Sequence, residues 1–243
     1  MFASFSLALQ FLTRLPLNLD ITISEHRIGQ SVLFYPLVGL LIGGTLLLVC
    51  YLLAGQPVAL SAAIILTVWV LLTGGLHLDG LADCSDAWAG GLVSKERSLA
   101  IMKDPAAGPI AVIILILILL LKWTALQSLL LQKNELLPLL LAPFLGRLSI
   151  LLLMLSTPYI RINGLGSTMQ QYLPTRTAKL IVCCSLLLIL LINPYTLLSS
   201  LILIALIRHL AIQRLQGVTG DVYGASVEMV EAMVLISLAL NHG

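Results

Sequence analysis

Three aspartates and a histidine lie close together in the segment HLDGLADCSDAW, residues 77–88. Asp79, Asp83 and Asp86 have the spacing i, i+4 and i+7, so on a helix they share one stripe about 60° wide. Like charges on one stripe repel each other unless a cation lies against them. Carboxylate oxygens suit Mg²⁺, Mn²⁺ or Ca²⁺, and Mg²⁺ is typically held by one or two carboxylates together with substrate phosphates. We therefore expect the stripe to bind a divalent metal ion, with all three aspartates as candidate ligands.

His77 lies two residues ahead of the stripe, at the start of the predicted helix, where it could be a base, a phosphate donor or a metal ligand. We take His77 and Asp83 as the candidate catalytic residues. The alternative is a solvated helix end just outside the bilayer, with its acids paired to Lys95 or Arg97. We favour the metal site, because acids at membrane depth are costly and are functional by default.

A second acidic cluster lies near the C-terminus, in the segment GVTGDVYGASVEMVE. Asp221 and Glu228 are seven residues apart and share a helix face, and Glu231 follows one turn later. We expect Asp221 and Glu228 to be metal ligands, with Glu231 in support. In the alternative, the two glutamates neutralise Arg147 or Lys122 by ion pairing inside the protein.

Basic residues that could bind phosphate lie between the two acidic clusters. Lys103 and Asp104 precede a turn rich in Pro and Gly, and a helix is expected to begin at Pro109. A helix N-terminus with a nearby lysine favours phosphate, so Lys103 is a candidate phosphate contact and Asp104 a supporting residue. The alternative is an ordinary loop beside the membrane. Arg147, inside an apolar run, is a second candidate phosphate contact or else a partner for the C-terminal glutamates.

The composition indicates a polytopic helical membrane protein of the all-α class. Of the 243 residues, 59% are hydrophobic and 10% are charged, whereas a soluble domain has about 25% charged residues. Apolar runs long enough to cross the bilayer predict about seven transmembrane helices, within a range of roughly six to eight. The predicted spans are 31–53, 58–76, 109–130, 136–156, 178–193, 195–212 and 224–240. The net charge of +2 is too small to suggest nucleic acid.

We expect one integral membrane domain, 1–243, with an interfacial helix within 1–30 and a cytoplasmic acidic segment with the active site at 77–108. The fifth and sixth spans, which only Asn193-Pro194 separates, could instead form one re-entrant pair. With the N-terminus in the cytoplasm, almost all Lys and Arg residues outside the spans are cytoplasmic, and only Lys133 lies opposite. The active site is therefore predicted at the cytoplasmic face.

The chain resembles the cobalamin synthase family, whose activity is that of an adenosylcobinamide-GDP ribazoletransferase, over almost its whole length. The most specific motif is Gly-Gly-x-His-Leu-Asp-Gly-Leu-Ala-Asp, and its acids are also similar to the Asp-rich motif of CDP-alcohol phosphotransferases. The matching segments are FLTRLP (11–16), FYPLVGLLIGG (34–44), GGLHLDGLADCSDAWAGG (74–91), MKD (102–104) and TGDVYGASVEMVE (219–231).

The resemblance implies the last step of nucleotide-loop assembly in cobalamin. A ribose hydroxyl of α-ribazole, or of its 5′-phosphate, attacks the diphosphate of adenosylcobinamide-GDP, GMP leaves, and adenosylcobalamin or its 5′-phosphate forms. It also implies Mg²⁺ as cofactor and a multi-pass location in the bacterial inner membrane. Self-association, or association with other enzymes of the pathway, stays open.

One stretch departs from the family pattern. After Met-Lys-Asp, relatives often have a serine and then a basic residue, whereas this chain has Pro105–Pro109. A basic contact would be missing from this loop. Either that contact is dispensable, or Arg161 or Arg176 replaces it.

Two other functions stay open from the sequence. A phosphotransferase of the CDP-alcohol type, which makes a phospholipid head group or a polyprenyl product, would use the same metal chemistry. A divalent cation transporter would use intramembrane acids near the bilayer midplane, and such folds often carry internal repeats. Here most acids gather at one face and no repeat is evident.

Overall fold

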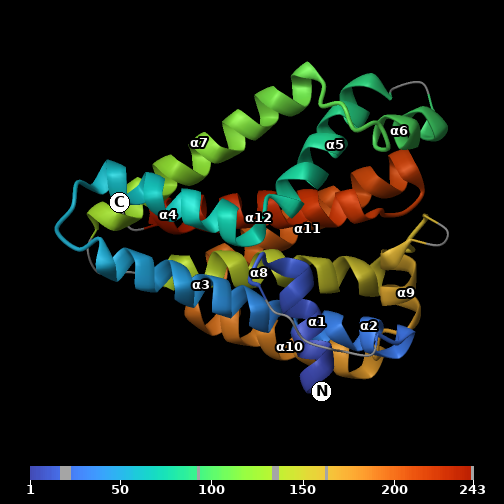
Figure 1. Cartoon of the computed structure of the whole chain (residues 1–243), viewed down its shortest axis with the longest axis horizontal. Coiled ribbons are helices and arrows are strands. Elements are labelled where there is room, and N and C mark those ends of the chain that lie inside the picture. Colours follow the sequence, from blue (N-terminus) through green and yellow to red (C-terminus); the bar gives the residue numbers. More distant parts are fainter. Residues whose placement is uncertain (17–22, 92–93, 133–136, 162–163, 242–243) are drawn as a thin grey trace.

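The computed structural model describes residues 1–16, 23–91, 94–132, 137–161 and 164–241, and these form helices with no β-strand among them. The expected all-α class is therefore confirmed (Figure 1). The helices are α1 (Phe2–Leu12), α2 (Glu25–Ser31), the 3₁₀ helix η1 (Val32–Phe34), α3 (Tyr35–Leu52), α4 (Val58–Thr73), α5 (Leu76–Gly90), α6 (Lys95–Ile101), α7 (Pro109–Leu131), α8 (Leu137–Ser156), α9 (Leu165–Gln171), α10 (Thr175–Ile192), α11 (Pro194–Leu215) and α12 (Gly220–Asn241).

Six helical segments of the described chain are long and apolar enough to cross a membrane. They are the run from α2 to α3, and α7, α8, α10, α11 and α12. A seventh crossing requires α4 and α5 together, and these are bent by 89°. The 16 residues of α4 rise about 24 Å, less than a hydrocarbon core of about 30 Å. The chain is thus a multi-pass membrane protein as predicted, and α10 and α11 are each long enough to cross separately.

Two consecutive glycines make the bend between α4 and α5. Gly74 and Gly75 have φ angles of 64° and 68°, in the left-handed region that glycine adopts without steric cost. Gly74 also lies against the side chain of Arg14, whose Nε would be 2.2 Å from an added Cβ. The backbone N–H of Arg14 donates to Leu72 O at 2.8 Å and so ties the end of α4 to the segment after α1. The bend sets the direction of α5, which carries the aspartate stripe.

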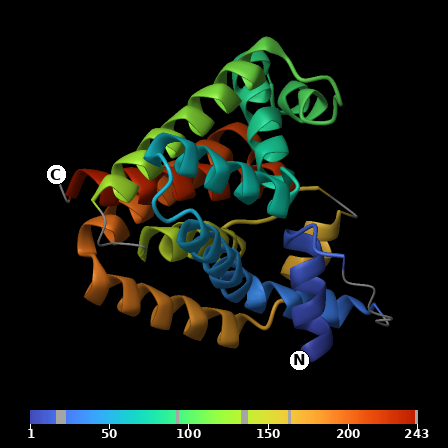
Figure 2. The same ribbon diagram turned by 60° about the vertical axis from the view of Figure 1, so that its left-hand side comes forward.

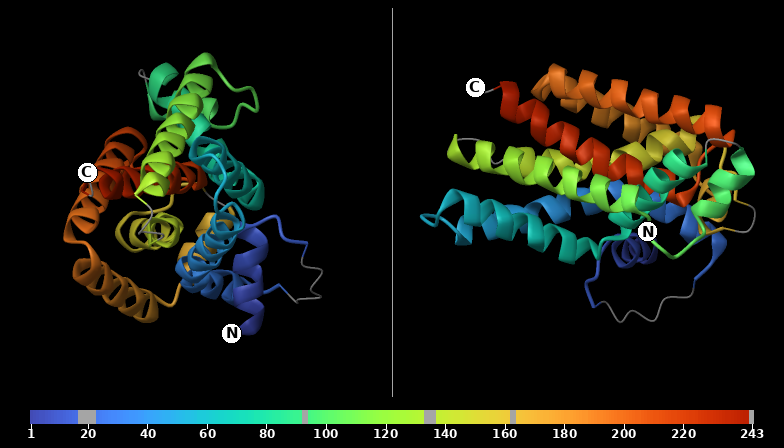
Figure 3. Two further views of the ribbon diagram at one scale, coloured as in Figure 1. Left: turned by 90° about the vertical axis from the view of Figure 1, so that its left-hand side faces the viewer. Right: turned by 90° about the horizontal axis from the view of Figure 1, so that it is seen from above.

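The centre of the bundle is formed by α8 and α12. The left view of Figure 3 shows α8 nearly end-on, with α12, α3 and α10 around it. Gly39 and Gly43 of α3 lie against the α8 backbone, because an added Cβ would be 2.4 Å from Pro143 O and 2.6 Å from Leu139 O. Small residues spaced by four let two helix backbones approach closely, which is a common way to pack helices in a membrane.

The first helix, α1, runs across the long helices and not along them, as Figure 1 and Figure 2 both show. Phe5 of α1 packs edge-on against Phe34, with ring centres 5.8 Å apart. This direction suits the interfacial helix expected within residues 1–30. Residues 17–22 of that segment lie outside the described part of the chain, as does Lys133.

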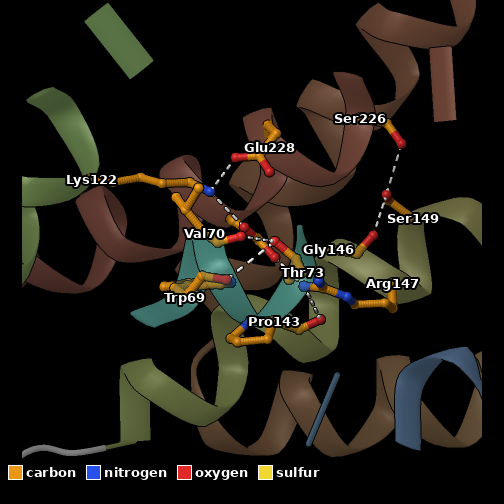
Figure 4. A network of polar contacts seen from close by, with 11 residues as sticks. Trp69, Val70, Thr73, Lys122, Pro143, Gly146, Arg147, Ser149, Ser226 and Glu228 are labelled. Carbon is orange, nitrogen blue, oxygen red and sulfur yellow. Dashed lines mark hydrogen bonds and ion pairs between the residues drawn. The ribbon is translucent and has the colours of Figure 1, made fainter. Parts of the chain in front are cut away.

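A network of buried charges joins α7, α8 and α12 inside the bundle (Figure 4). Lys122 of α7 pairs with Glu228 and, at 2.6 Å, with Glu231 of α12. Arg147 of α8 pairs with the other carboxylate oxygen of Glu231. The Lys122 ammonium also lies 4.9 Å from the ring centre of Trp69 in α4, a cation–π contact. The two cations balance the two carboxylates, which is the condition for burying charge in apolar surroundings.

Gly43 and Gly44 give a matched test of the close packing between α3 and α8. An added Cβ at Gly43 meets backbone atoms, whereas nothing lies within 4 Å of one at Gly44. We expect Gly43→Leu to lower the free energy of unfolding by about 1–3 kcal/mol or more, the usual range for overpacking, and Gly44→Leu to leave it almost unchanged. Thermal unfolding of both purified variants in one detergent measures this. Equal melting temperatures would show that the close approach contributes nothing to stability.

Removing one charge from the buried network should cost more stability than removing a balanced pair. Arg147→Met leaves Glu231 short of a cation in apolar surroundings, so we expect a loss of about 3–5 kcal/mol. The double variant Arg147→Met/Glu231→Gln restores the balance and should be more stable than the single variant. Melting temperatures in the same detergent compare them. If the double variant is less stable than the single one, the two residues do not act as a charge pair.

Candidate active site

The two predicted acidic clusters meet where α5 crosses α12. The crossing is close because both helices have a glycine there: an added Cβ at Gly80 would lie 2.8 Å from Asp221 O, and one at Gly224 would lie 3.2 Å from His77 O. A side chain at either position would push the helices apart. The crossing therefore brings the aspartate stripe of α5, including the half-buried Asp83, beside Asp221 at the start of α12.

Arg161 is the cation that pairs with an acid at this crossing. Its Nη2 lies 2.6 Å from Oδ2 of Asp221 and donates to Met102 O at 3.4 Å. The hydroxyl of Thr219 donates to the same carboxylate oxygen at 3.2 Å. Asp83 lies within electrostatic reach of Arg161 and of the neighbouring acids. We call this group of carboxylates, Asp79, Asp83 and Asp221, the acidic face.

Backbone and side-chain contacts hold Arg161 in this position. Tyr159 and Val218 form an isolated parallel β-bridge, in which Ile160 N donates to Val218 O at 3.0 Å. The side chain of Gln170 in α9 accepts from Tyr159 N at 2.8 Å. The segment after α8 is thereby fixed to the segment before α12. Arg161 was considered in the sequence only as one substitute for a missing loop contact, and its closeness to Asp221 arises from this tertiary pairing.

Asp86, the third member of the stripe, has a different set of contacts. Its Oδ2 accepts from Gly108 N at 2.5 Å and its Oδ1 accepts from Ala111 N at 2.9 Å. It therefore caps the N-terminus of α7, where free N–H groups and the helix dipole favour an anion. A side chain at Gly108 would displace this carboxylate, because an added Cβ would lie 2.7 Å from it. The metal-binding role of Asp86 stays a prediction, and the contacts observed are structural.

The C-terminal cluster is divided between two places. Asp221 lies at the acidic face, whereas Glu228 lies two turns further along α12, about 10 Å along the helix axis. Glu228, Glu231 and Arg147 all belong to the buried charge network, as in the ion-pairing alternative from the sequence. Their predicted roles in binding metal and phosphate stay predictions. Their charges are already balanced inside the bundle, together with Lys122.

The predicted phosphate-binding loop lies beside Arg161. Lys103 and Asp104 are both exposed, and the Asp104 carboxylate accepts from Ala106 N at 3.0 Å within its own turn. Arg161 reaches this loop through its bond to Met102 O. The helix end that the sequence suggested for phosphate is the one capped by Asp86. Arg161 is thus placed to take the part of the absent basic residue, whereas Arg176 is exposed at the start of α10.

A cavity of about 220 Å³ adjoins the acidic face, and Asp79, Asp221 and His77 line it together. His77 is buried, with 4% of its surface exposed, and its Nδ1 has no hydrogen-bond partner among the described residues. Tyr159 and Tyr223 stack in the cavity wall, with ring centres 6.0 Å apart. Burial raises the pKa of Tyr159, so its hydroxyl stays protonated at neutral pH. The sequence did not single out these two tyrosines, although Tyr223 lies inside one of the matching motifs.

The acidic face offers the donor atoms that Mg²⁺ prefers, since its side chains present only carboxylate oxygens. Within the described ranges, no three His, Cys, Asp or Glu side chains come close enough to hold a metal ion by themselves. The residues present therefore fit an ion that one or two carboxylates bind together with substrate phosphates, and such partly protein-bound Mg²⁺ sites are usual. The chemistry that this arrangement could support is transfer of a phosphate group.

Known proteins match this chain over nearly its whole length. The sequence model of a family described as "Cobalamin-5-phosphate synthase" matches residues 4–239. The adenosylcobinamide-GDP ribazoletransferase of Pseudomonas putida is 48% identical over 237 residues, which cover 98% of each chain. The protein of that name from Pseudomonas aeruginosa is 50% identical over 241 residues, again 98% of each chain. No solved structure matches the sequence.

The family match spans both the helix pair that forms the acidic face and the motifs on which the resemblance was based. The chain belongs to the cobalamin-5-phosphate synthase family.

Proposed function

We propose that this chain joins adenosylcobinamide-GDP to α-ribazole, or to α-ribazole 5′-phosphate, and releases GMP. The names of the relatives give the substrates, and those relatives cover nearly all of both chains. The observation that carries the proposal is the crossing of α5 over α12. It gathers oxygen ligands and the guanidinium of Arg161 at one face, as transfer from a diphosphate requires.

The proposed reaction exchanges a phosphoanhydride bond for a phosphate ester bond. The ribose hydroxyl oxygen bonds to the phosphorus that carries the cobinamide, and the bond from this phosphorus to the bridging oxygen breaks. GMP leaves with the bridging oxygen, and the hydroxyl proton passes to a base. One or two of Asp79, Asp83 and Asp221 would hold Mg²⁺ together with the substrate phosphates, and the ion when bound would neutralise charge on the diphosphate and on departing GMP.

Three residues at and beside the acidic face would have separate roles in the reaction. Arg161 can turn from Asp221 to a phosphate oxygen, because a guanidinium binds phosphate and carboxylate with the same donor geometry. Asp83, half-buried between the other acids, is our candidate base for the hydroxyl proton. His77 lies in the cavity wall and would orient the acceptor substrate.

We place the acidic face in the cytoplasm and the chain in the bacterial inner membrane. Lys95, Lys103 and Arg161 belong to α6, the loop after it and the segment before α9, which lie at the end of the bundle where α5 ends (Figure 1). Positively charged connections mark the cytoplasmic side of a multi-pass protein. The two other functions considered from the sequence lack specific support: the relatives are ribazoletransferases, and the intramembrane glutamates are paired with cations.

We expect GMP release from adenosylcobinamide-GDP and α-ribazole to require both Mg²⁺ and Asp83. Purified protein should lose activity in EDTA and regain it when Mg²⁺ is added. Asp83→Asn should lower kcat by about 10²–10⁴-fold, the range for losing a positioned base, with its melting temperature unchanged. Chromatographic measurement of GMP gives the rate. Near-normal turnover of Asp83→Asn at saturating Mg²⁺ would refute the assignment.

Asp86 is the matched control on the same stripe. Asp86→Ala removes both hydrogen bonds to the start of α7 and should cost about 0.5–2 kcal/mol of stability, as for other helix caps. Its kcat, measured well below the melting temperature, should fall far less than that of Asp83→Asn. A kcat as low as that of Asp83→Asn, in a variant of normal stability, would instead make Asp86 a metal ligand.

Arg161 and Arg176 can be compared as substitutes for the basic residue absent from the loop. Arg161→Gln should lower kcat/KM for adenosylcobinamide-GDP by about 10²-fold, as expected for losing one charged donor to the reacting phosphate. Arg176→Gln, at the exposed start of α10, should keep normal kinetics. Steady-state GMP release at varied adenosylcobinamide-GDP measures both. The reverse order of effects would assign the phosphate contact to Arg176.

A further inference from the structure

We propose that the cavity beside the acidic face binds the aromatic base of the ribazole substrate. This inference rests on the proposed function and adds a position for one substrate within the site. The cavity lies between α1, α5, α8, α9 and α12, and its lining includes Asp79 and Asp221 of the acidic face. A base held in the cavity therefore leaves its ribose beside the carboxylates, where the attacking hydroxyl has to be.

The size and walls of the cavity suit a flat bicyclic ring. Its volume of about 220 Å³ exceeds the roughly 150 Å³ of an apolar cavity that can hold benzene. Ile150 and Met154 of α8 and Met169 of α9 give it apolar walls. The base of ribazole is a benzimidazole with two methyl groups, which gains free energy when it leaves water for such walls.

Two pairs of aromatic side chains contribute to the cavity lining. Phe11 and Tyr35 stack with ring centres 6.1 Å apart and an interplanar angle of 17°. Tyr159 and Tyr223 form the second stacked pair, and both pairs contribute to the lining. Stacking of a base on an aromatic side chain stabilises binding. Gly166 leaves room for the ring of Tyr159, because an added Cβ there would lie 2.4 Å from that ring.

Two buried polar atoms in the lining have no hydrogen-bond partner among the described residues. They are Tyr223 Oη and His77 Nδ1, on side chains that are 6% and 4% exposed. A buried polar atom without a partner costs free energy, so such atoms in a cavity indicate the place of a polar group of a ligand. A benzimidazole nucleoside has one ring nitrogen free to accept, and the Tyr223 hydroxyl can donate to it.

The kinds of polar side chain in the cavity argue against the guanine base of the other substrate. Guanine carries acceptors at N7 and O6 and a donor at N2, and each must find a partner when it is buried. The carboxylates of Asp79 and Asp221 only accept when ionised, so neither can pair with N7 or O6 of guanine. The cavity therefore selects a base with one polar position over a base with several.

Direct binding to the full-length protein tests the inference without turnover. Isothermal titration of protein in lipid nanodiscs, with EDTA and without any corrinoid, compares α-ribazole with guanosine. Wild type should bind α-ribazole and not guanosine. Ile150→Phe, which fills the cavity, should raise the Kd for α-ribazole at least about 10-fold, and Tyr223→Phe should raise it several-fold through the lost hydrogen bond. Melting temperatures establish that each variant is folded.

A matched control is Leu130→Phe, which adds a ring beside a second cavity lined by Cys50, Leu53 and Leu129. This variant should bind α-ribazole as wild type does. Tighter binding of guanosine than of α-ribazole, or a wild-type Kd in both Ile150→Phe and Tyr223→Phe, would overturn the inference. In that case GMP release by wild type would still support the proposed function. Absence of GMP release by wild type, with α-ribazole still bound in the cavity, would overturn the function alone.

Discussion

The acidic face depends on one close contact between helix backbones, at Gly80 of α5 and Gly224 of α12. An added Cβ at Gly80 would come within 3.2 Å of the Cα of Gly224, so even alanine at Gly80 would separate the helices. Their approach brings two acidic segments together from positions about 140 residues apart in the sequence. Repulsion between those acids opposes the crossing, and Arg161 offsets part of it by pairing with Asp221. A bound divalent cation would offset more of it, which links the packing to the chemistry.

Charges inside the bundle and charges at its face serve different purposes. Lys122, Arg147, Glu228 and Glu231 compensate one another, and burial without such compensation would be strongly unfavourable. The acids of the face have one paired arginine for several carboxylates, and that arginine is partly exposed at 26%. Excess negative charge with access to solvent can attract a cation, whereas balanced charge in an apolar interior cannot. The same acidic residue types therefore hold the bundle together in one place and are free to bind in another.

Most helices could be predicted from the sequence, because a helix that crosses the membrane requires a long apolar run and such runs can be read along the chain. The helical repeat also predicted the shared stripe of Asp79 and Asp83. It could not separate Asp221 from Glu228, since both lie on one side of α12 and only tertiary contacts with Lys122 distinguish them. The short α4 and its 89° bend were also missed, because the apolar run continues past Thr73 while the left-handed glycines end the helix. The position of Arg161 could not be predicted, because it depends on the β-bridge between Tyr159 and Val218, which no local sequence pattern indicates.

The cap that Asp86 provides has a consequence for how the sequence can vary. The chain leaves α5 one turn after Asp86 and returns to the carboxylate of Asp86 at Gly108. Two hydrogen bonds from the start of α7 to Asp86 fix α7 to α5, so changes in the turn just before Gly108 need not shift the helix that holds Asp83. The departure from the family pattern expected at Pro105 lies in this turn and would leave α5 in place. The Asp86 carboxylate thus acts as an anchor that makes the direction of α5 independent of the sequence of this turn.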